Sequence, residues 1–593
     1  MSRLPLFVAS FARPHVLYPA ILPELILIGG ALLLLVAASL SGRRVPSGVY
    51  TGYTVVVSAA AFGASFWLWG DVRHVGSYTA IAGAIAVDGF SALFLVLVSG
   101  ALMLSALVSQ VWLDRARVGG AELYVLSMLS GAGAMLMAAA NDLIVLFLGL
   151  EIMSIALYVM AGFDSRRAES GEAAVKYFIL GAFSSAIFLY GIALVYGATG
   201  STNLVHVAHY LAHHAVLSNG VLLGGMALLL VGLGFKVAAV PFHAWTPDVY
   251  QGSPSPVTGF MAAVAKAGGF AGLLRVFFST FSTLRVDWQP ALLGLAALTL
   301  VVGAVLAVVQ RNIKRMLAYS SISHAGYVLA GLAAATATGI AGSLYYLLTY
   351  MFMVIGSFAV VTVVGDWSGA GDDIEAYRGL GSRRPLLALS FAILLTAQAG
   401  VPFTTGFLGK FYVIAAVVQS GYYWLAILGM VSAVIAAFFY LRVVVLMYLP
   451  GQVAAPALAG VEVSRAGPSP GPAGVSAAST PAAGLAPTRP APDVSPGPVG
   501  EPTAPEHGLG RLFPTVFGPL AGTATLDEGP GLDPSGNGAG APAQAAEATT
   551  APSLPRVPVV AMVVIAVCVL FTIGFGLVPS PLVHFAHNST LLL

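Results

Sequence analysis

Three of the five lysines in this chain lie inside strongly apolar segments of the sequence. They are Lys236 in LLLVGLGFKVAAVPF, Lys266 in TGFMAAVAKAGGFAGLL and Lys410 in AGVPFTTGFLGKFYVIAAVV. The other basic residues are arginines, nearly all in polar loops or at segment ends. Arginine stays charged at any biological pH, whereas a lysine removed from water can lose its proton near neutrality. Lysines in an apolar interior therefore indicate chemistry in which protons move.

Glu151 is the acidic residue placed to work with these lysines. It follows the expected start of a helix at Asp142 by about two and a half turns, which at about 5.4 Å per turn puts it near the middle of a bilayer. Lys266 lies at a similar depth in its own segment. Burying such a charge costs roughly 3 kcal/mol, so we expect a Glu–Lys pair or a hydrated cavity. A static ion pair that only fixes helix packing is the alternative.

Two of the lysines lie beside prolines that should break their helices. Lys236 comes shortly before Pro241, and Lys410 comes shortly after Pro402. Proline removes a backbone hydrogen bond, and the carbonyls that it frees are tolerated in a membrane only against protein or water. We therefore expect both lysines where discontinuous helices line an internal path. The opposite order of lysine and proline suggests two inverted halves.

Histidine is the natural relay between such sites because it titrates near neutral pH. His324 lies near the middle of its apolar segment and is the main candidate, with a hydrogen-bonded core histidine as the alternative. His243, just after Pro241, and Lys176, near the start of its segment, are secondary candidates. For Lys176, extension of the side chain to the membrane interface is the competing interpretation. Lys314 is interpreted as a cytoplasmic loop charge.

Other charged and histidine residues suggest interfacial roles. The run NLVHVAHYLAHH would place several histidines on one helical face, where they could bind a metal, but an interfacial helix is the favoured interpretation. Residues near predicted helix ends are also expected at the membrane interface. The histidines are His206, His209, His213 and His214, and the helix-end residues are Asp88, Arg275 and Arg442.

Composition defines the class of protein and excludes several functions. Hydrophobic residues make up 58% of the 593 residues and charged residues 8%, so we expect an all-α polytopic membrane protein. The net charge of +2 argues against nucleic acid as a partner. Cys568 is the only cysteine, which excludes an intrachain disulfide and a cysteine-ligated iron–sulfur cluster. No nucleotide-binding, phosphate-binding or HExxH motif occurs, so we expect no cofactor and no metal in this chain.

Apolar runs of spanning length predict about fourteen transmembrane helices. Arginine and lysine gather in alternate loops, which places those loops in the cytoplasm and both termini on the outer side. The predicted spans are 20–41, 48–70, 84–113, 123–140, 142–163, 173–197, 220–241, 255–280, 290–310, 316–335, 339–364, 386–416, 421–449 and 557–579. The basic loops carry Arg43/Arg44, Arg115/Arg117, Arg166/Arg167, Arg311/Lys314/Arg315 and Arg378/Arg383/Arg384.

The chain divides into three regions. Residues 1–450 hold helices 1–13, with a channel core at about 120–450 and a first helix that is retained rather than cleaved as a signal peptide. Residues 451–555 are rich in Pro, Ala, Gly and Ser and are predicted to be a disordered cytoplasmic linker. Residues 556–593 should hold helix 14 and a short outer tail.

Four runs resemble signatures of the antiporter-like membrane subunits of respiratory complex I, the proton-translocating NADH–quinone oxidoreductase. They are GFKVAAVPFHAWTPDVYQGSPSPVTGFMAAVAKAGG, LFLGLEIMSIALYVMAGF, RNIKRMLAYSSISHAGYVLAGL and AGVPFTTGFLGKFYVI. The resemblance covers about 1–450 and 556–593, and the linker departs from the family's usual pattern.

The resemblance implies both a fold and a set of roles. The fold would have two inverted five-helix repeats, with helices 7 and 12 broken. Glu151 and Lys236 would form a modulating pair, Lys266 would be the central proton carrier, Lys410 the exit-side site, and His324 would lie between them. The chain would be a multi-pass subunit of a bacterial inner membrane, surrounded by the lipid bilayer and the other membrane subunits of complex I. NADH, FMN, iron–sulfur clusters and quinone would belong to partner subunits.

Two alternatives stay open from the sequence. The chain could be a subunit of a multisubunit cation/proton antiporter, which shares the same Glu and Lys pattern. It could also be an assembly scaffold with inactive channels, although a scaffold gains little from buried charges that are costly to keep.

Overall fold

The computed structural model describes residues 16–41, 45–214, 220–365, 372–450 and 557–589, and the predicted linker lies outside these ranges. Within them, eleven helices are long and apolar enough to cross a membrane, so the chain is a multi-pass membrane protein. Ten are η1–α1 (Tyr18–Ile21, Leu22–Leu40), α2 (Ser47–Val75), α3 (Gly89–Ala116), α4 (Ala121–Ala139), α5 (Leu143–Ala161), α6 (Ala168–Thr199), η4–α12 (Ser282–Leu284, Arg285–Val308), α14 (Ala337–Gly365), α18 (Tyr423–Tyr448) and α19 (Val559–Leu577).

The eleventh span is a composite helix at the centre of the bundle. It runs through α10 (Ser255–Phe260), the π-helical segment η2 (Met261–Ala265), α11 (Lys266–Leu274) and a second π-helical segment, η3 (Arg275–Thr280). Its most apolar stretch is wholly buried, against 94% for α14 and 89% for α3. The sequence did not predict the π-helical segments. Lys266 lies at the junction of the first one with α11.

Five further helices complete the apolar bundle. They are α8 (Gly220–Lys236), α9 (Trp245–Gly252), α13 (Ile313–Ala333), α16 (Pro385–Ala399) and α17 (Thr405–Gln419). Four of them are halves of broken helices and too short to span alone. α13 carries several polar residues and is not among the eleven. The total of fourteen spans and the inverted repeats therefore stay predictions.

Both predicted helix breaks are confirmed. α8 ends at Lys236, and α9 begins only at Trp245 on the far side of Pro241. The Phe235 carbonyl freed by the break accepts a hydrogen bond of 3.0 Å from Trp245 Nε1, and Val240 N donates to Thr299 Oγ1 at 2.9 Å. α16 ends at Ala399, and α17 begins at Thr405. The breaks are thus satisfied by protein groups, as the apolar surroundings require.

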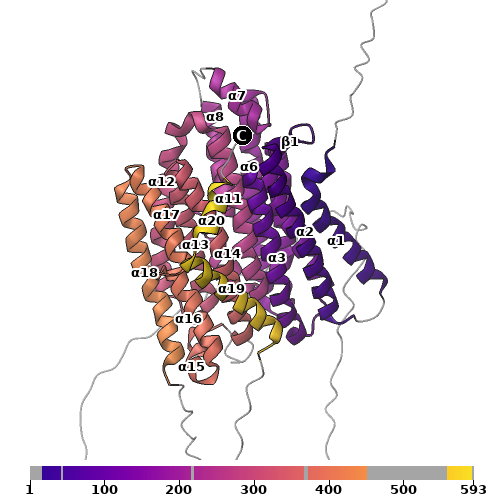
Figure 1. Ribbon diagram of the computed structural model, residues 1–593, viewed down its shortest axis with the longest axis vertical. Coiled ribbons are helices and arrows are strands. Elements are labelled where there is room, and N and C mark those ends of the chain that lie inside the picture. The colour runs from indigo at the N-terminus through magenta and orange to yellow at the C-terminus, as the bar shows by residue number, and fades with distance from the viewer. Residues whose placement is uncertain (1–15, 42–44, 215–219, 366–371, 451–556, 590–593) are drawn as a thin grey trace, which may run out of the picture. The chain divides into compact units, whose positions relative to one another are not determined.

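The ends of the bundle carry the shorter elements. An antiparallel hairpin of β1 (Tyr78–Ala80) and β2 (Ile85–Val87) pairs Tyr78 with Val87, and lies with α7 (Leu204–His213) at one end, which we call the α7 end (Figure 1). α15 (Leu380–Arg383), preceded by η5 (Ile374–Tyr377), lies at the opposite end, the α15 end (Figure 1). α19 packs against α3, α14 and α17, and α20 (Ser580–His587) packs against α14.

Local sequence explains where several helices begin. A polar side chain just before the helix accepts a hydrogen bond from a backbone N–H in its first turn, which satisfies a donor that would otherwise have no partner. Asp88, Asp142, Asn203, Asn312 and Thr404 cap α3, α5, α7, α13 and α17 in this way.

The expected interfacial positions of Asp88 and Arg275 are wrong. The two side chains are 0% and 1% exposed and form an ion pair of 2.9 Å inside the bundle. The two residues come from segments far apart in the sequence. Each charge is balanced by the other, and the position of a residue within its own helix does not reveal such a partner. Arg442 is exposed and donates to the Val308 carbonyl at 3.1 Å, as an interfacial residue can.

Candidate functional site

Lys266, the first residue of α11, is buried at the centre of the bundle. Its Nζ donates to Ser321 Oγ at 2.5 Å and to the carbonyl oxygen of the same residue. The Tyr350 hydroxyl donates to Ser321 Oγ at 2.8 Å, and Nζ lies 5.5 Å from the centre of the Tyr350 ring. These partners are all uncharged. A carboxylate would strongly favour the charged ammonium over the neutral amine, whereas uncharged hydroxyl and carbonyl groups accept hydrogen bonds from either form without that charge attraction.

His324 lies on α13, one turn after Ser321, and is also buried. Its Nδ1 is 2.7 Å from the Tyr346 hydroxyl, and its Nε2 is 3.1 Å from the Tyr440 hydroxyl. The His324 ring also packs against the Tyr350 ring, with centroids 4.9 Å apart. Both imidazole nitrogens therefore face hydroxyl groups, which can donate or accept a proton.

Lys410 lies at the second helix break and is buried there. Its Nζ donates to the carbonyls of Gln398 and Ala399 at 2.9 and 2.7 Å. These carbonyls end α16, so the ammonium occupies the negative end of a helix dipole. Gly400 follows with φ +96°, and a Cβ there would lie 3.0 Å from Lys410 Cδ. Glycine is needed at this position for the turn and for the close approach of the lysine.

Tyr440 joins His324 to the Lys410 site. Besides His324, its hydroxyl bonds to Ser320 Oγ and to Gln398 Oε1, the latter at 3.3 Å. The backbone carbonyl of the same glutamine accepts from Lys410, and Gln398 Nε2 is fixed by a bond of 2.8 Å to Ser357 Oγ. Adjacent serines of α13, Ser320 and Ser321, thus face the Lys410 and Lys266 groups respectively. We call the set Lys266, Ser321, Tyr350, His324, Tyr440, Gln398 and Lys410 the central relay.

Lys236, the last residue of α8, forms a separate buried group. Its Nζ donates to Ser154 Oγ at 2.8 Å and to the Tyr177 hydroxyl at 3.2 Å. Its side chain packs against α11, where a Cβ on Gly269 would lie 3.3 Å from Lys236 Cγ. Among the described residues, no hydrogen bond connects this group with the central relay.

Glu151 does not form the expected direct pair with Lys236. No ion pair within 4.0 Å joins the two side chains, and Glu151 Oε1 is buried without a hydrogen-bond partner among the described residues. Ser154 lies one turn after Glu151 on α5 and takes the position beside the ammonium. Residues three apart share a helix face, so Glu151 still lies next to the lysine's binding group. Its side chain is half-buried rather than enclosed.

Among the described residues, the secondary candidates make no hydrogen bond or ion pair with the three buried lysines. Lys176 is half-exposed at the α15 end, where it pairs with Glu172 at 2.6 Å and with Asp248 at 2.9 Å. Arg315 reaches the other oxygen of Asp248 at 2.7 Å. Burial alone would raise the pKa of Asp248, but hydrogen bonds from Lys176 and Arg315 outweigh it and lower the pKa below its ordinary value. His243 is half-buried in the first helix break, and its Nδ1 has no partner among the described residues.

The interpretation of Lys314 as a loop charge is wrong. Lys314 is 1% exposed in the first turn of α13, where its Nζ donates to the Ser253 carbonyl at 2.7 Å and pairs with Asp372 at 3.3 Å. Asp372 lies beyond α14, so the pairing depends on tertiary structure. This lysine ties the start of α13 to the loop before α10.

The histidine-rich run forms α7 and lies at the α7 end. Leu204, Val207 and Leu211 are buried on one face, as expected for an interfacial helix. The rings of His213 and His214 bond to backbone carbonyls one turn earlier. The parts of the chain that the structure describes contain no group of three or more side chains arranged to hold a metal ion.

Sequence reasoning missed the polar residues that surround Lys266, His324 and Lys410. Tyr346, Tyr350, Tyr440, Gln398 and Ser321 all lie in apolar segments, where a buried hydroxyl or amide needs a partner. The need of a buried polar group for a partner was the one feature of the sequence that could have indicated these residues. Spacing alone could not show which tyrosines turn inward, since the chain has twenty-two of them.

Comparison with known proteins identifies the family. A family model described as "NADH:quinone oxidoreductase/Mrp antiporter, TM" matches residues 140–436. The chain is 44% identical over 456 residues to NADH-quinone oxidoreductase subunit N of Trichlorobacter lovleyi, which covers 75% of this chain and 92% of that protein. The chain belongs to the subunit N family. Subunit N 3 of Streptomyces griseus is 41% identical over 485 residues and covers 74% of this chain and 87% of its own.

Solved structures agree with membership of the subunit N family. A chain of respiratory complex I from Thermus thermophilus with bound aureothin is 35% identical and superposes with a TM-score of 0.61, over 72% of this chain and 90% of that one. A chain of an archaeal membrane-bound sulfane sulfur reductase is 28% identical, with a TM-score of 0.65 over 73% and 88%. A chain of the Mrp complex from Dietzia is 22% identical with a TM-score of 0.64, which shows a shared fold.

Proposed function

We propose that this chain is the proton-translocating subunit N of an NADH–quinone oxidoreductase. The observation that carries the proposal is the set of three buried lysines, Lys236, Lys266 and Lys410, whose hydrogen-bond partners are all uncharged. A static ion pair would need a carboxylate within contact distance of each ammonium. Uncharged partners instead allow each lysine to exist with or without its extra proton, which a carrier requires.

The proton would move in a defined order. Lys236, modulated by Glu151, would control the proton on Lys266 through its charge. Lys266 would release its proton through Ser321 toward His324, whose two nitrogens face hydroxyls on opposite sides. His324 would exchange a proton with the Tyr440 hydroxyl, which lies beside Gln398, and the Gln398 backbone carbonyl holds Lys410 on the exit side. Each step passes one proton between neighbouring groups, and Lys266 must be reprotonated before the next cycle.

The first step requires a change in the Glu151 side chain. In the structure the carboxylate has an oxygen without a partner, and Ser154 holds the lysine instead. A rotation of the carboxylate toward Lys236 would pair the charges and hold the lysine protonated. Its withdrawal would return the lysine to uncharged partners. Redox chemistry in partner subunits would drive this switching.

The proposal extends to partners, cofactors and orientation. NADH, FMN, iron–sulfur clusters and quinone would be bound by other subunits. The single cysteine, Cys568, is a buried thiol in α19 and cannot by itself ligate an iron–sulfur cluster. The partners would be the lipid bilayer and the other membrane subunits of complex I. The arginine-rich α15 end would face the cytoplasm of a bacterial inner membrane, with both termini on the outer side.

Purification of the chain from its own membrane tests the assignment to complex I. We expect a tagged chain to bring flavin- and iron–sulfur-containing subunits with NADH–quinone reductase activity. A multisubunit antiporter would yield only small membrane subunits and no flavin. In the assembled complex, Glu151→Gln should impair proton pumping coupled to NADH oxidation. Pumping that survives neutralisation of all three buried lysines would instead support an inactive scaffold.

A further inference from the structure

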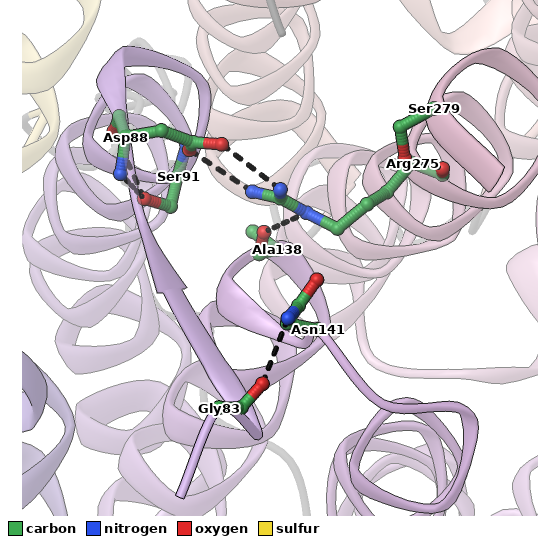
Figure 2. Close-up of polar contacts among 7 residues, drawn as sticks. All are labelled: Gly83, Asp88, Ser91, Ala138, Asn141, Arg275 and Ser279. Atoms are coloured by element: carbon green, nitrogen blue, oxygen red, sulfur yellow. Dashed lines mark hydrogen bonds and ion pairs between the residues drawn. The ribbon is translucent and has the colours of Figure 1, made fainter. Parts of the chain in front are cut away.

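The ion pair of Asp88 and Arg275 is fully buried yet outside the central relay. Figure 2 shows the planar guanidinium facing the carboxylate, with Arg275 Nη1 2.9 Å from Asp88 Oδ2 and Nη2 3.0 Å from Oδ1. Ser91 N donates to Asp88 Oδ1 at 2.7 Å, and Arg275 Nε donates to the Ala138 carbonyl at 3.0 Å. The guanidinium also lies 4.8 Å from the centre of the Phe90 ring. All three guanidinium nitrogens of Arg275 therefore donate hydrogen bonds.

These contacts join three elements at the α7 end. Asp88 caps α3, Ala138 lies in the last turn of α4, and Arg275 begins η3 at the end of the composite helix that carries Lys266. A buried ion pair is a poor source of stability, because removing both charges from water offsets most of their attraction. Its best-attested use is to fix one arrangement among several. Here the pair joins the residue that follows α11 to α3.

α11 lies in an irregular part of the composite helix. It is bounded by π-helical segments on both sides, η2 before Lys266 and η3 from Arg275 onward. A π turn contains an extra residue, so a shift from π to α geometry rotates the helical residues after that turn. Glycine and alanine occupy five of its nine positions, and such small residues let α11 approach its neighbours closely. Lys266 and Arg275 are the polar residues at its two ends.

We propose that Arg275 is a positioning residue for proton transfer. Its pairing with Asp88 pins the end of α11 to α3 and α4, and thereby keeps Lys266 Nζ on Ser321. Without the pin, the π-helical segments relax and Lys266 leaves the start of the central relay. This inference rests on the proposed function, since it assigns a task to the same lysine.

The test compares variants in the complete complex, reconstituted in vesicles. Asp88→Asn combined with Arg275→Gln removes both charges, so that no buried charge is left unpaired. Arg275→Lys keeps the charge but gives up the two-pronged geometry and the bond to Ala138. Asn141→Ala is the matched control, because Asn141 lies in the same region and holds the hairpin at Gly83 with a bond of 2.7 Å, without contacting Arg275 (Figure 2). Lys266→Ala is the reference for a lost carrier.

The readout is protons pumped per NADH oxidised, corrected for the amount of assembled complex. We expect the double variant to fall toward the Lys266→Ala value, Arg275→Lys to fall part of the way, and Asn141→Ala to match the parent. If the double variant does not assemble, Arg275→Lys carries the test alone, and a parental ratio from it overturns the proposal. A loss of assembled complex with an unchanged ratio also overturns it. A parental ratio in Lys266→Ala would instead refute the proposed function.

Discussion

Replacing Tyr440 by phenylalanine tests whether the central relay conducts. The change removes one hydroxyl, which bonds to His324 Nε2 at 3.1 Å, to Gln398 Oε1 at 3.3 Å and to Ser320 Oγ, and it keeps the buried ring. The His324 and Lys410 groups would lose the hydroxyl that connects them. We expect Tyr440→Phe to lower proton pumping in the assembled complex.

Two effects of this substitution differ in magnitude and in the quantity that they change. Each buried hydrogen bond contributes about 1 kcal/mol net, so the loss of three weakens the fold by roughly 1–3 kcal/mol. That loss lowers the amount of assembled complex. A positioned group that transfers a proton contributes on the order of 100-fold or more in rate. Loss of the relay therefore lowers pumping by each assembled complex.

Tyr345→Phe is the matched control for Tyr440→Phe. Tyr345 is equally buried, but its hydroxyl has no hydrogen-bond partner among the described residues and lies outside the central relay. Both variants would be purified as whole complex and assayed in vesicles with a pH-sensitive dye while NADH oxidation is followed. We expect the control to pump normally. Normal pumping by Tyr440→Phe, at a normal rate per complex, would refute conduction through this hydroxyl.

Two further predictions concern a helix break and the α15 end. Gly400→Ala should cost about 1–2 kcal/mol because φ there is +96°, and it should also impair pumping because the new Cβ crowds Lys410. Gly421→Ala, at φ +81° with nothing within 4 Å, should cost similar stability and leave pumping per complex unchanged, and equal pumping in both variants would contradict the reasoning. Asp248→Asn should lower the free energy of unfolding by roughly 1 kcal/mol or less, since the pairs are partly exposed, and the Tm of the complex should fall modestly with it. The folded-state pKa of Asp248 is lowered. Its contribution to the stability of the fold is therefore complete above about pH 4 and is lost as the pH falls through the lower folded-state pKa. The difference in Tm between parent and variant should accordingly stay constant from about pH 5 to 8. A difference that disappears within that range would contradict the assignment.

The parts of the fold that follow from local chemistry were predictable. Pro241 and Pro402 predict the two helix breaks, because proline lacks the backbone N–H that a helix needs. The burial of Lys236, Lys266, Lys410 and His324 follows from their apolar neighbours in the sequence. Their roles in proton transfer stay proposals.

The parts that depend on contacts between distant segments were not predictable. Asp88 and Arg275 find each other across 187 positions, and Lys314 pairs with Asp372 beyond the next helix. The π-helical segments, MAAVA and RVFFST, were missed because runs of five and six residues are too short to show a hydrophobic period. Ser154 beside Lys236 was missed because a serine in an apolar helix usually bonds to its own backbone.

The central claim is that Lys266 carries the proton. Whole complex containing Lys266→Ala, reconstituted in sealed vesicles, gives the most direct measurement: the number of protons pumped per NADH oxidised. We predict a lower ratio than in the parent complex at equal subunit content. An assembled Lys266→Ala complex that pumps with the parental ratio would contradict the claim.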